Sequence, residues 1–201
     1  MTIIHKAVNK LKESLEGSGC DHGVVSLWIN NDVPVCQYPR GVCLEGVYGG
    51  RTAEMVTTTP LEAKTKIAFL YDATLKKPKT RAAAVAIINV VAGFACISRK
   101  LHACPPSSHA ECREMLKKMY DSGKVYPVGN LKEIPELFRG RIAESPETAD
   151  FIIIAGDELI SDEGIEIQEK YQDTKEIIYL GPSTAGVAAL LDLKHWCPFG
   201  R

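Results

Sequence analysis

The 201-residue sequence has no excess of charge of either sign. It contains 24 Lys and Arg residues against 25 Asp and Glu residues, which gives a formal net charge of −1. There is no block of like charges that would indicate an interaction tail. Nucleic-acid-binding domains usually carry a clustered basic excess. We therefore expect no nucleic-acid partner.

Long hydrophobic runs are also absent. The longest apolar stretch, 82–97, has 16 residues and is interrupted by Asn89 and Gly93. A membrane helix needs about 20 apolar residues, so this stretch predicts a buried helix, and we expect no membrane partner. The first ten residues lack a secretory apolar core. The seven cysteines are odd in number. Reduced thiols in a cytoplasmic protein are the simplest explanation.

Several catalytic and nucleotide-binding signatures are missing. The glycine-rich stretch 41–51 has no G-K-S/T sequence, which argues against a nucleotide phosphate loop. No dinucleotide fingerprint follows the first strand expected in the C-terminal half. His109-Ala-Glu111 has the H-x-E order of zinc deaminases, but the P-C-x-x-C that they require does not follow. No Ser-His-Asp or Cys-His nucleophile can be assigned.

The hydrophobic pattern predicts an α/β protein in two parts. Residues 1–78 should form a small α+β part, and residues 79–201 a Rossmann-like part with a parallel sheet. In the first part, apolar spacing predicts a helix over 3–16 and strands over 24–29, 33–38 and 42–48. Turn residues then predict a helix start at 57–62, with Pro60 in its first turn, and the stretch 66–71 is a strand or a helix end. The second part should begin with a helix over 81–100 that is capped by Thr80.

Three apolar strands that each lead to a glycine indicate the parallel sheet. They cover 125–128, 151–155 and 177–180, are separated by helical patterns, and are followed by Gly129, Gly156 and Gly181. Ligands collect outside the carboxyl ends of such strands. We therefore expect a site in a cleft between the two parts, at the three glycines.

The turn Gly181-Pro182-Ser183-Thr184 is the strongest candidate within this edge. A strand, a turn and a helix start would aim backbone N–H groups and two hydroxyls at one point. Such a point suits an anion or another electron-rich group. The alternative is a plain helix cap, in which the hydroxyls serve the backbone.

The C-terminal half resembles the Rossmann-like domain of the heavy-metal chelation domain family, a family of unknown function. The similarity rests on Val128-Gly129, on the stretch 149–159, on Gly181-Pro182-Ser183-Thr184 and, more loosely, on 80–89. The N-terminal part of that family resembles the N-terminal domain of enolases, with helices and a small antiparallel sheet. The resemblance implies a two-part fold and a small-molecule ligand, with a transition metal or a metal chelate as the cofactor.

Histidine and cysteine residues suggest a metal site directly after the helix expected over 81–100. His102, Cys104, His109 and Cys112 lie within eleven residues. Soft sulfur and imidazole ligands suit zinc, iron, nickel or copper. The spacing is not that of a standard zinc site, and the alternative is a surface loop that enters a helix. His195 and Cys197 form a second possible metal pair.

Other polar residues are candidates near the predicted edge. Asp157 and Glu158 follow the second strand and could ligate a metal or act as catalytic acids or bases. Asn130 follows Gly129. Arg51 could meet an anionic ligand if its loop reaches the sheet edge; otherwise the loop is an ordinary hairpin turn. Asn89 is polar within an apolar helix, so it should bond to backbone or to a ligand.

These patterns support three functional hypotheses. The leading one is a cytoplasmic binding protein for a small anionic or metal-chelating molecule, with a role in handling a metal cofactor. The second is an enzyme of cofactor biosynthesis, a transferase or a lyase, that uses Asp157, Glu158 or a cysteine. The third is a structural-metal protein that uses the His102–Cys112 cluster. A homo-oligomer is compatible with all three.

Overall fold

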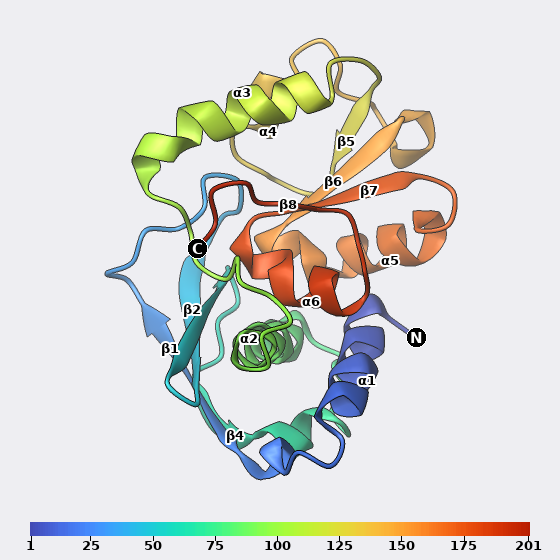
Figure 1. The fold of residues 1–201 in the computed structure, drawn as a ribbon. Coiled ribbons are helices and arrows are strands. Elements are labelled where there is room, and N and C mark those ends of the chain that lie inside the picture. Colours follow the sequence, from blue (N-terminus) through green and yellow to red (C-terminus); the bar gives the residue numbers. More distant parts are fainter.

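The computed structural model describes all 201 residues and contains two four-stranded sheets with helices between and around them (Figure 1). The antiparallel sheet has the order β3-β2-β1-β4 and the parallel sheet the order β5-β6-β7-β8. The strands are β1 Val24–Asn30, β2 Val42–Tyr48, β3 Arg51–Thr57, β4 Ala63–Lys66, β5 Val125–Pro127, β6 Phe151–Ala155, β7 Glu176–Leu180 and β8 His195–Trp196. The predicted two-part α/β fold is confirmed.

Six α-helices complete the fold. They are α1 Ile3–Leu15, α2 Pro78–Phe94, α3 His109–Met119, α4 Ile134–Leu137, α5 Asp162–Tyr171 and α6 Ala185–Leu190. Helix α2 lies between the antiparallel sheet and α6, while α3 and α4 cover the opposite face of the parallel sheet (Figure 1). No helix combines the length and the hydropathy needed to span a bilayer.

Two hydrophobic cores follow from the two faces of the parallel sheet. Along β6, Ile152 and Ile154 join the larger core with α1, α2, α5 and α6. The alternate residues Phe151, Ile153 and Ala155 join the smaller core under α3 and α4. This alternation is the period-two pattern of a strand that is buried on both faces.

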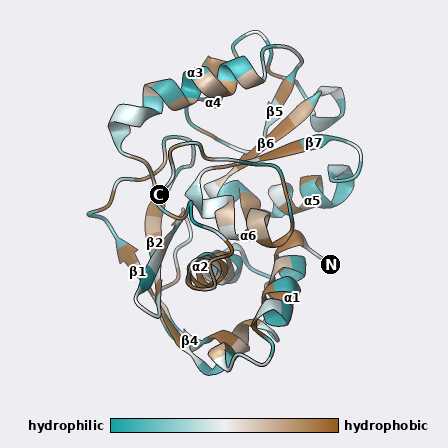
Figure 2. Cartoon of the chain, in the orientation of Figure 1, coloured by the Kyte–Doolittle hydropathy of each residue, from teal (hydrophilic) through white to brown (hydrophobic).

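Helix α2 is buried along most of its length because two layers pack on it. It contacts β2 and β3 on one side and α6 on the other. Figure 2 shows hydrophobic colour concentrated on α2 and on the parallel strands, with hydrophilic colour on outer surfaces such as that of α3. The predicted division between residues 78 and 79 falls at the start of α2. The larger core nevertheless contains residues from both sides of this division.

Several expected elements differ in the structure. The strand expected over 33–38 is wrong, because this segment is an irregular loop that crosses to the parallel sheet. The helix start expected at 57–62 is also wrong: β3 ends at Thr57, and the chain then runs irregularly to β4. Strand β3, which follows the Gly49-Gly50 turn, was not expected. The stretch 66–71 is mainly a 3₁₀ turn, Ile67–Leu70.

The long helix is shorter than expected and begins earlier. Pro78 occupies its first turn and Lys77 the capping position, so Thr80 is not the cap. The helix ends at Phe94 rather than near residue 100. Cys96 adopts a left-handed conformation (φ 59°), and the Ile97 N–H bonds back to the Ala92 carbonyl. This arrangement is a common way to end a helix.

The close approach of α6 to α2 gives a first prediction. A Cβ on Gly186 would lie 2.5 Å from Oδ1 and 2.9 Å from Cα of Asn89. We expect Gly186→Ala to lower the free energy of unfolding by about 1–3 kcal/mol through overpacking, despite the better helix propensity of alanine. Urea denaturation measures this. Ala189→Ser, on an exposed position of the same helix, should change stability by less than about 0.5 kcal/mol. Equal stability of Gly186→Ala and wild type would contradict the packing.

Candidate functional site

The three glycines lie at the carboxyl edge of the parallel sheet as expected. Gly129, Gly156 and Gly181 have positive φ angles of 63°, 53° and 79°, which glycine adopts without strain. Gly181 directly follows β7, and its N–H donates to the Trp196 carbonyl. The sharp turns at the strand ends are therefore present.

The loop 33–40 covers this edge and fills the expected cleft. A Cβ on Gly156 would lie 2.3 Å from Cβ of Pro39, and one on Gly181 would lie 3.0 Å from Sγ of Cys36. The Lys132 N–H donates to the Tyr38 carbonyl at 2.8 Å. The cavity that reaches Gly181 measures only about 10 Å³, room for a single water molecule. The prediction of an open ligand cleft at the three glycines is therefore wrong.

Gly129 and Asn130 also contact protein groups, namely Arg40 of the loop 33–40 and Glu158 of the turn that follows β6. Arg40 Nε donates to the Asn130 carbonyl at 2.9 Å, and the Asn130 N–H donates to Oε1 of Glu158 at 3.4 Å. A Cβ on Gly129 would lie 2.2 Å from the Glu158 carboxyl carbon. These residues join the loop to the sheet edge.

The turn Gly181-Pro182-Ser183-Thr184 is buried, and its polar side chains bond within the protein. All three residues after Gly181 are buried. Ser183 Oγ accepts from the Val56 N–H at 2.9 Å, which joins the turn to β3. Thr184 Oγ1 donates to the carbonyls of Leu180 and Gly181. The two hydroxyls therefore bond to backbone, as in the capping alternative, and are not aimed at a ligand.

Asn89 is fully buried and bonds to backbone only. Its Nδ2 donates to the carbonyls of Glu54 and Ser183 at 3.0 Å and, more weakly, to that of Pro182 at 3.4 Å. Its Oδ1 accepts from the Gly186 N–H at 3.0 Å. One amide thus joins α2, β3, the Gly181 turn and α6. The backbone alternative for Asn89 is confirmed.

Asp157 and Glu158, the two catalytic candidates, bond to residues of neighbouring segments. The carboxylate of Asp157 accepts hydrogen bonds from the hydroxyls of Thr57 and Thr58 at the end of β3. Glu158 bonds to the Asn130 N–H, and burial raises the pKa of its carboxyl. Both acids contact protein groups rather than a cavity for a substrate. A catalytic role for either acid stays a prediction.

The predicted metal ligands do not assemble. His102 Nδ1 lies 3.3 Å from Oε1 of Glu54, and Sγ of Cys112 lies 3.2 Å from the Tyr38 hydroxyl. The ring of His109 is half-buried, which lowers its pKa. No three His, Cys, Asp or Glu side chains in the chain are grouped as metal ligands. The His102-Cys104-His109-Cys112 site is therefore wrong, and His195 bonds to the Gly181 carbonyl instead of pairing with Cys197.

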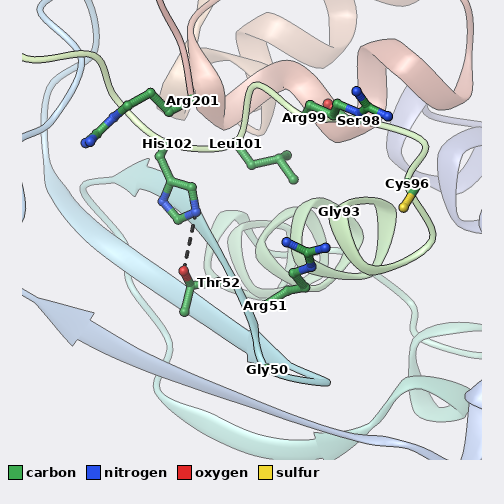
Figure 3. A pocket seen from close by; sticks show the side chains of 10 residues that line it. All are labelled: Gly50, Arg51, Thr52, Gly93, Cys96, Ser98, Arg99, Leu101, His102 and Arg201. Carbon is green, nitrogen blue, oxygen red and sulfur yellow. Dashed lines mark hydrogen bonds between the residues drawn. The ribbon is translucent and has the colours of Figure 1, made fainter.

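A larger cavity lies at the other end of the β2–β3 hairpin. Its volume is about 490 Å³. Figure 3 shows the ten residues that line it: Gly50, Arg51, Thr52, Gly93, Cys96, Ser98, Arg99, Leu101, His102 and Arg201. We call it the arginine pocket. It combines the hairpin turn, the end of α2, the segment after α2 and the last residue of the chain.

The segments of the arginine pocket are held by backbone and carboxylate contacts. The N–H groups of Leu101 and His102 both donate to the Arg201 carbonyl, and the Arg201 N–H donates to the His102 carbonyl. Glu54, with a side chain 3% exposed, accepts from His102 and from the Ala103 N–H. These contacts place His102 against Thr52, as drawn in Figure 3.

The arginine pocket is rich in positive charge because its three arginines have no Asp or Glu partner. No carboxylate lies within 4.0 Å of the guanidinium of Arg51, Arg99 or Arg201. Among these three guanidinium groups, only that of Arg201 makes a hydrogen bond within the protein, from Nε to the Ala103 carbonyl. The hydrogen bond to Glu54 raises the pKa of His102, and the Glu54 carboxylate offsets the charge that the ring gains.

The sequence identified only part of this pocket. Arg51 was a candidate anion contact, and His102 was a candidate metal ligand. Arg99 and Arg201 carried no local signal, because neither belongs to a motif. Only the basic run Arg99-Lys100 after the expected helix, close to the contact-rich segment 101–103, could have drawn attention to this region.

Comparison with known proteins shows a fold and no activity. No family model and no curated protein matches the chain. A solved structure from Pyrococcus horikoshii, a protein of unknown function in the DUF364 family, is similar with a TM-score of 0.50 and 16% identity, covering 90% of this chain and 79% of that chain. The neighbour fits the expected likeness to a domain family of unknown function. Heavy-metal chelation stays a prediction.

The burial of Asn89 predicts a large effect of its removal. Asn89→Ala would leave the Gly186 N–H and two carbonyls without partners in the core. We expect the free energy of unfolding to fall by about 2–4 kcal/mol, measured by urea denaturation. Asn9→Ala, on the exposed face of α1, serves as the control and should be nearly neutral. A loss below about 1 kcal/mol for Asn89→Ala would contradict the structural role.

The pair His102 and Glu54 predicts a pH-dependent stability. Because the folded-state pKa of His102 is raised, its contribution is full below the unfolded pKa of about 6.5 and is lost as pH rises through the folded value. Wild type should therefore exceed His102→Gln in stability more at pH about 5.5 than at pH about 9. Thermal unfolding of both proteins across this range is the measurement. A difference that is constant with pH would show that the pair does not titrate in this way.

Proposed function

We propose that the protein is a cytoplasmic binding protein for a small anionic molecule, which it holds in the arginine pocket. The observation that carries the proposal is that Arg51, Arg99 and Arg201 line one cavity and have no Asp or Glu partner. Guanidinium groups recognise carboxylates and phosphates through paired hydrogen bonds. An anion would supply the missing counter-charge.

The size and the composition of the pocket support a small molecule. A volume of about 490 Å³ falls in the range of small-molecule sites. Thr52 and Ser98 add hydroxyls, and His102 adds a ring nitrogen that carries a proton more readily because of Glu54. A ligand with two or more anionic groups would use several of these cations together. A metal chelate built on carboxylates belongs to the same chemical class.

The arginines also come from distant parts of the chain. Arg51 begins β3, Arg99 follows α2, and Arg201 is paired with the 101–102 backbone. Like charges at such positions repel each other and contribute nothing to folding by themselves. Their convergence on one cavity is therefore better explained by a ligand than by stability.

Removal of the arginines should weaken anion binding. We expect Arg51→Ala and Arg99→Ala each to reduce affinity for citrate or inorganic phosphate roughly 5- to 10-fold, because each deletes one exposed charge-assisted contact. Isothermal titration calorimetry at low and at high salt measures this, and binding should weaken as salt rises. Titration with citrate alone and with ferric citrate would distinguish a simple anion from a metal chelate.

The matched control is Arg139→Ala, which removes an exposed arginine paired with Glu136 far from the pocket. It should bind as wild type does. Unchanged affinity in the Arg51 and Arg99 variants, or an equal loss in Arg139→Ala, would mean that any binding reflects overall charge and that the arginine pocket is not the site.

A further inference from the structure

A hydroxyl, an imidazole and a carboxylate lie in a row at one wall of the arginine pocket. Oγ1 of Thr52 lies 3.3 Å from Nε2 of His102. Nδ1 of the same ring lies 3.3 Å from Oε1 of Glu54. Figure 3 draws the contact between the threonine and the histidine. We call these three residues the Thr52 triad.

Strand β3 and the segment that follows α2 build this arrangement. Thr52 and Glu54 are two residues apart in β3, so their side chains lie on the same face of the sheet. The Glu54 N–H donates to the Leu101 carbonyl, and the Ala103 N–H donates to Oε2 of Glu54, both at 3.0 Å. These bonds hold His102 beside the strand, where one ring contacts both side chains.

The exposure of the three groups suits the roles of a nucleophilic triad. The side chain of Glu54 is buried, that of His102 is 30% exposed, and Thr52 is half-buried and lines the cavity. A buried carboxylate beside Nδ1 keeps the proton of a neutral ring on that nitrogen. Nε2 is then free to accept the proton of the hydroxyl, as in the hydroxyl–imidazole–carboxylate triads that occur on unrelated folds.

We propose that the Thr52 triad hydrolyses small carboxylic esters that carry a second, anionic group. The inference rests on the proposed function, because the arginines of the pocket would hold the anionic group. Triads of this kind catalyse acyl transfer, whereas enzymes of phosphoryl transfer rely largely on metal ions. The residues present therefore favour a carboxylic ester over a phosphate ester.

The reaction has two steps in which atoms and protons balance. His102 takes the proton of the Thr52 hydroxyl while Oγ1 forms a bond to the ester carbonyl carbon; the bond to the alcohol oxygen then breaks, and the alcohol leaves with that proton. Water then gives a proton to His102 and adds to the acyl carbon, and the acid leaves as Thr52 regains its proton. One ester and one water give one acid and one alcohol. The guanidinium groups of the pocket can donate to the carbonyl oxygen as it gains negative charge.

The charged groups near His102 suit a general base. The hydrogen bond to Glu54 raises the pKa of His102, partial burial acts in the opposite direction, and the carboxylate of Glu45 adds to the rise. The three arginines of the pocket favour the neutral ring, because like charges repel. A neutral ring with a raised pKa accepts a proton more readily. Activity should therefore increase as pH rises through this pKa.

Hydrolysis of mono(4-nitrophenyl) succinate, an ester with a free carboxylate, tests the proposal. We expect kcat/KM to exceed that for the neutral ester 4-nitrophenyl acetate by about tenfold or more, through the contacts of the carboxylate with the arginines. Thr52→Val and His102→Gln should each lower kcat at least about 100-fold. Thr52→Ser keeps the hydroxyl and should retain activity. Thr65→Val changes a half-buried strand threonine outside the pocket and should match wild type.

Glu54 is a positioning residue, and a pH profile separates its role from a purely structural one. Glu54→Gln should lower kcat and move the midpoint of the rise of kcat/KM to lower pH, because an amide no longer raises the pKa of His102. A structural loss alone would lower activity at every pH and leave the midpoint in place. Wild-type protein mixed with the succinate ester and quenched in acid should carry a succinyl group on Thr52, as read by mass spectrometry of its peptides.

Citrate binding by calorimetry distinguishes failure of this inference from failure of the proposed function. Wild-type protein that binds citrate but releases no 4-nitrophenol above the rate in buffer would overturn the esterase activity alone. Wild-type protein that shows neither binding nor hydrolysis would overturn both. The inference is also wrong if folded Thr52→Val retains full activity, or if the succinyl group is found only outside the Thr52 triad.

Discussion

The buried side-chain amide of Asn89 is the contact on which the arrangement of the two sheets depends. It lies in the middle of α2, with no exposed surface, and bonds to the backbone of β3, of the Gly181 turn and of α6. An amide offers donors and an acceptor together, so one side chain can pair groups of both kinds. Hydrophobic contacts around α2 are not directional. The amide therefore specifies the orientation that packing alone would leave loose.

The same junction explains why the sheet edge is closed. Ser183 bonds to β3, Asp157 bonds to Thr57 and Thr58, and the loop 33–40 lies over Gly156 and Gly181. Residues that in isolation look like ligand contacts thus bond the two parts to each other. Polar groups at a buried junction must be paired, and here they pair with backbone or with side chains of the other part. The features that attract a ligand at an open sheet edge serve assembly in this protein.

Charge and sulfur are then distributed to two different places. The unpaired guanidinium groups gather at the end of the hairpin, where the arginine pocket is accessible. Four of the seven cysteines line the small cavity under the covering loop. A multiply charged anion is suited only to the first place.

The sequence by itself determined the local elements and the class of fold. Apolar periodicity located α1, β1, β2, α2 and the three main parallel strands, and strand–glycine ends located Gly129, Gly156 and Gly181, because these signals depend on neighbours in the chain. The tertiary structure decided which residues that are distant in the sequence lie close together. Arg51, Arg99 and Arg201 are far apart in sequence, as are Cys36, Cys104, Cys112 and Cys197. The loop 33–40 has strand-like composition, yet its contacts with the distant sheet edge override that preference. Periodicity carries no information about such long-range contacts, so the arginine pocket and the grouping of these cysteines became visible only in the folded chain.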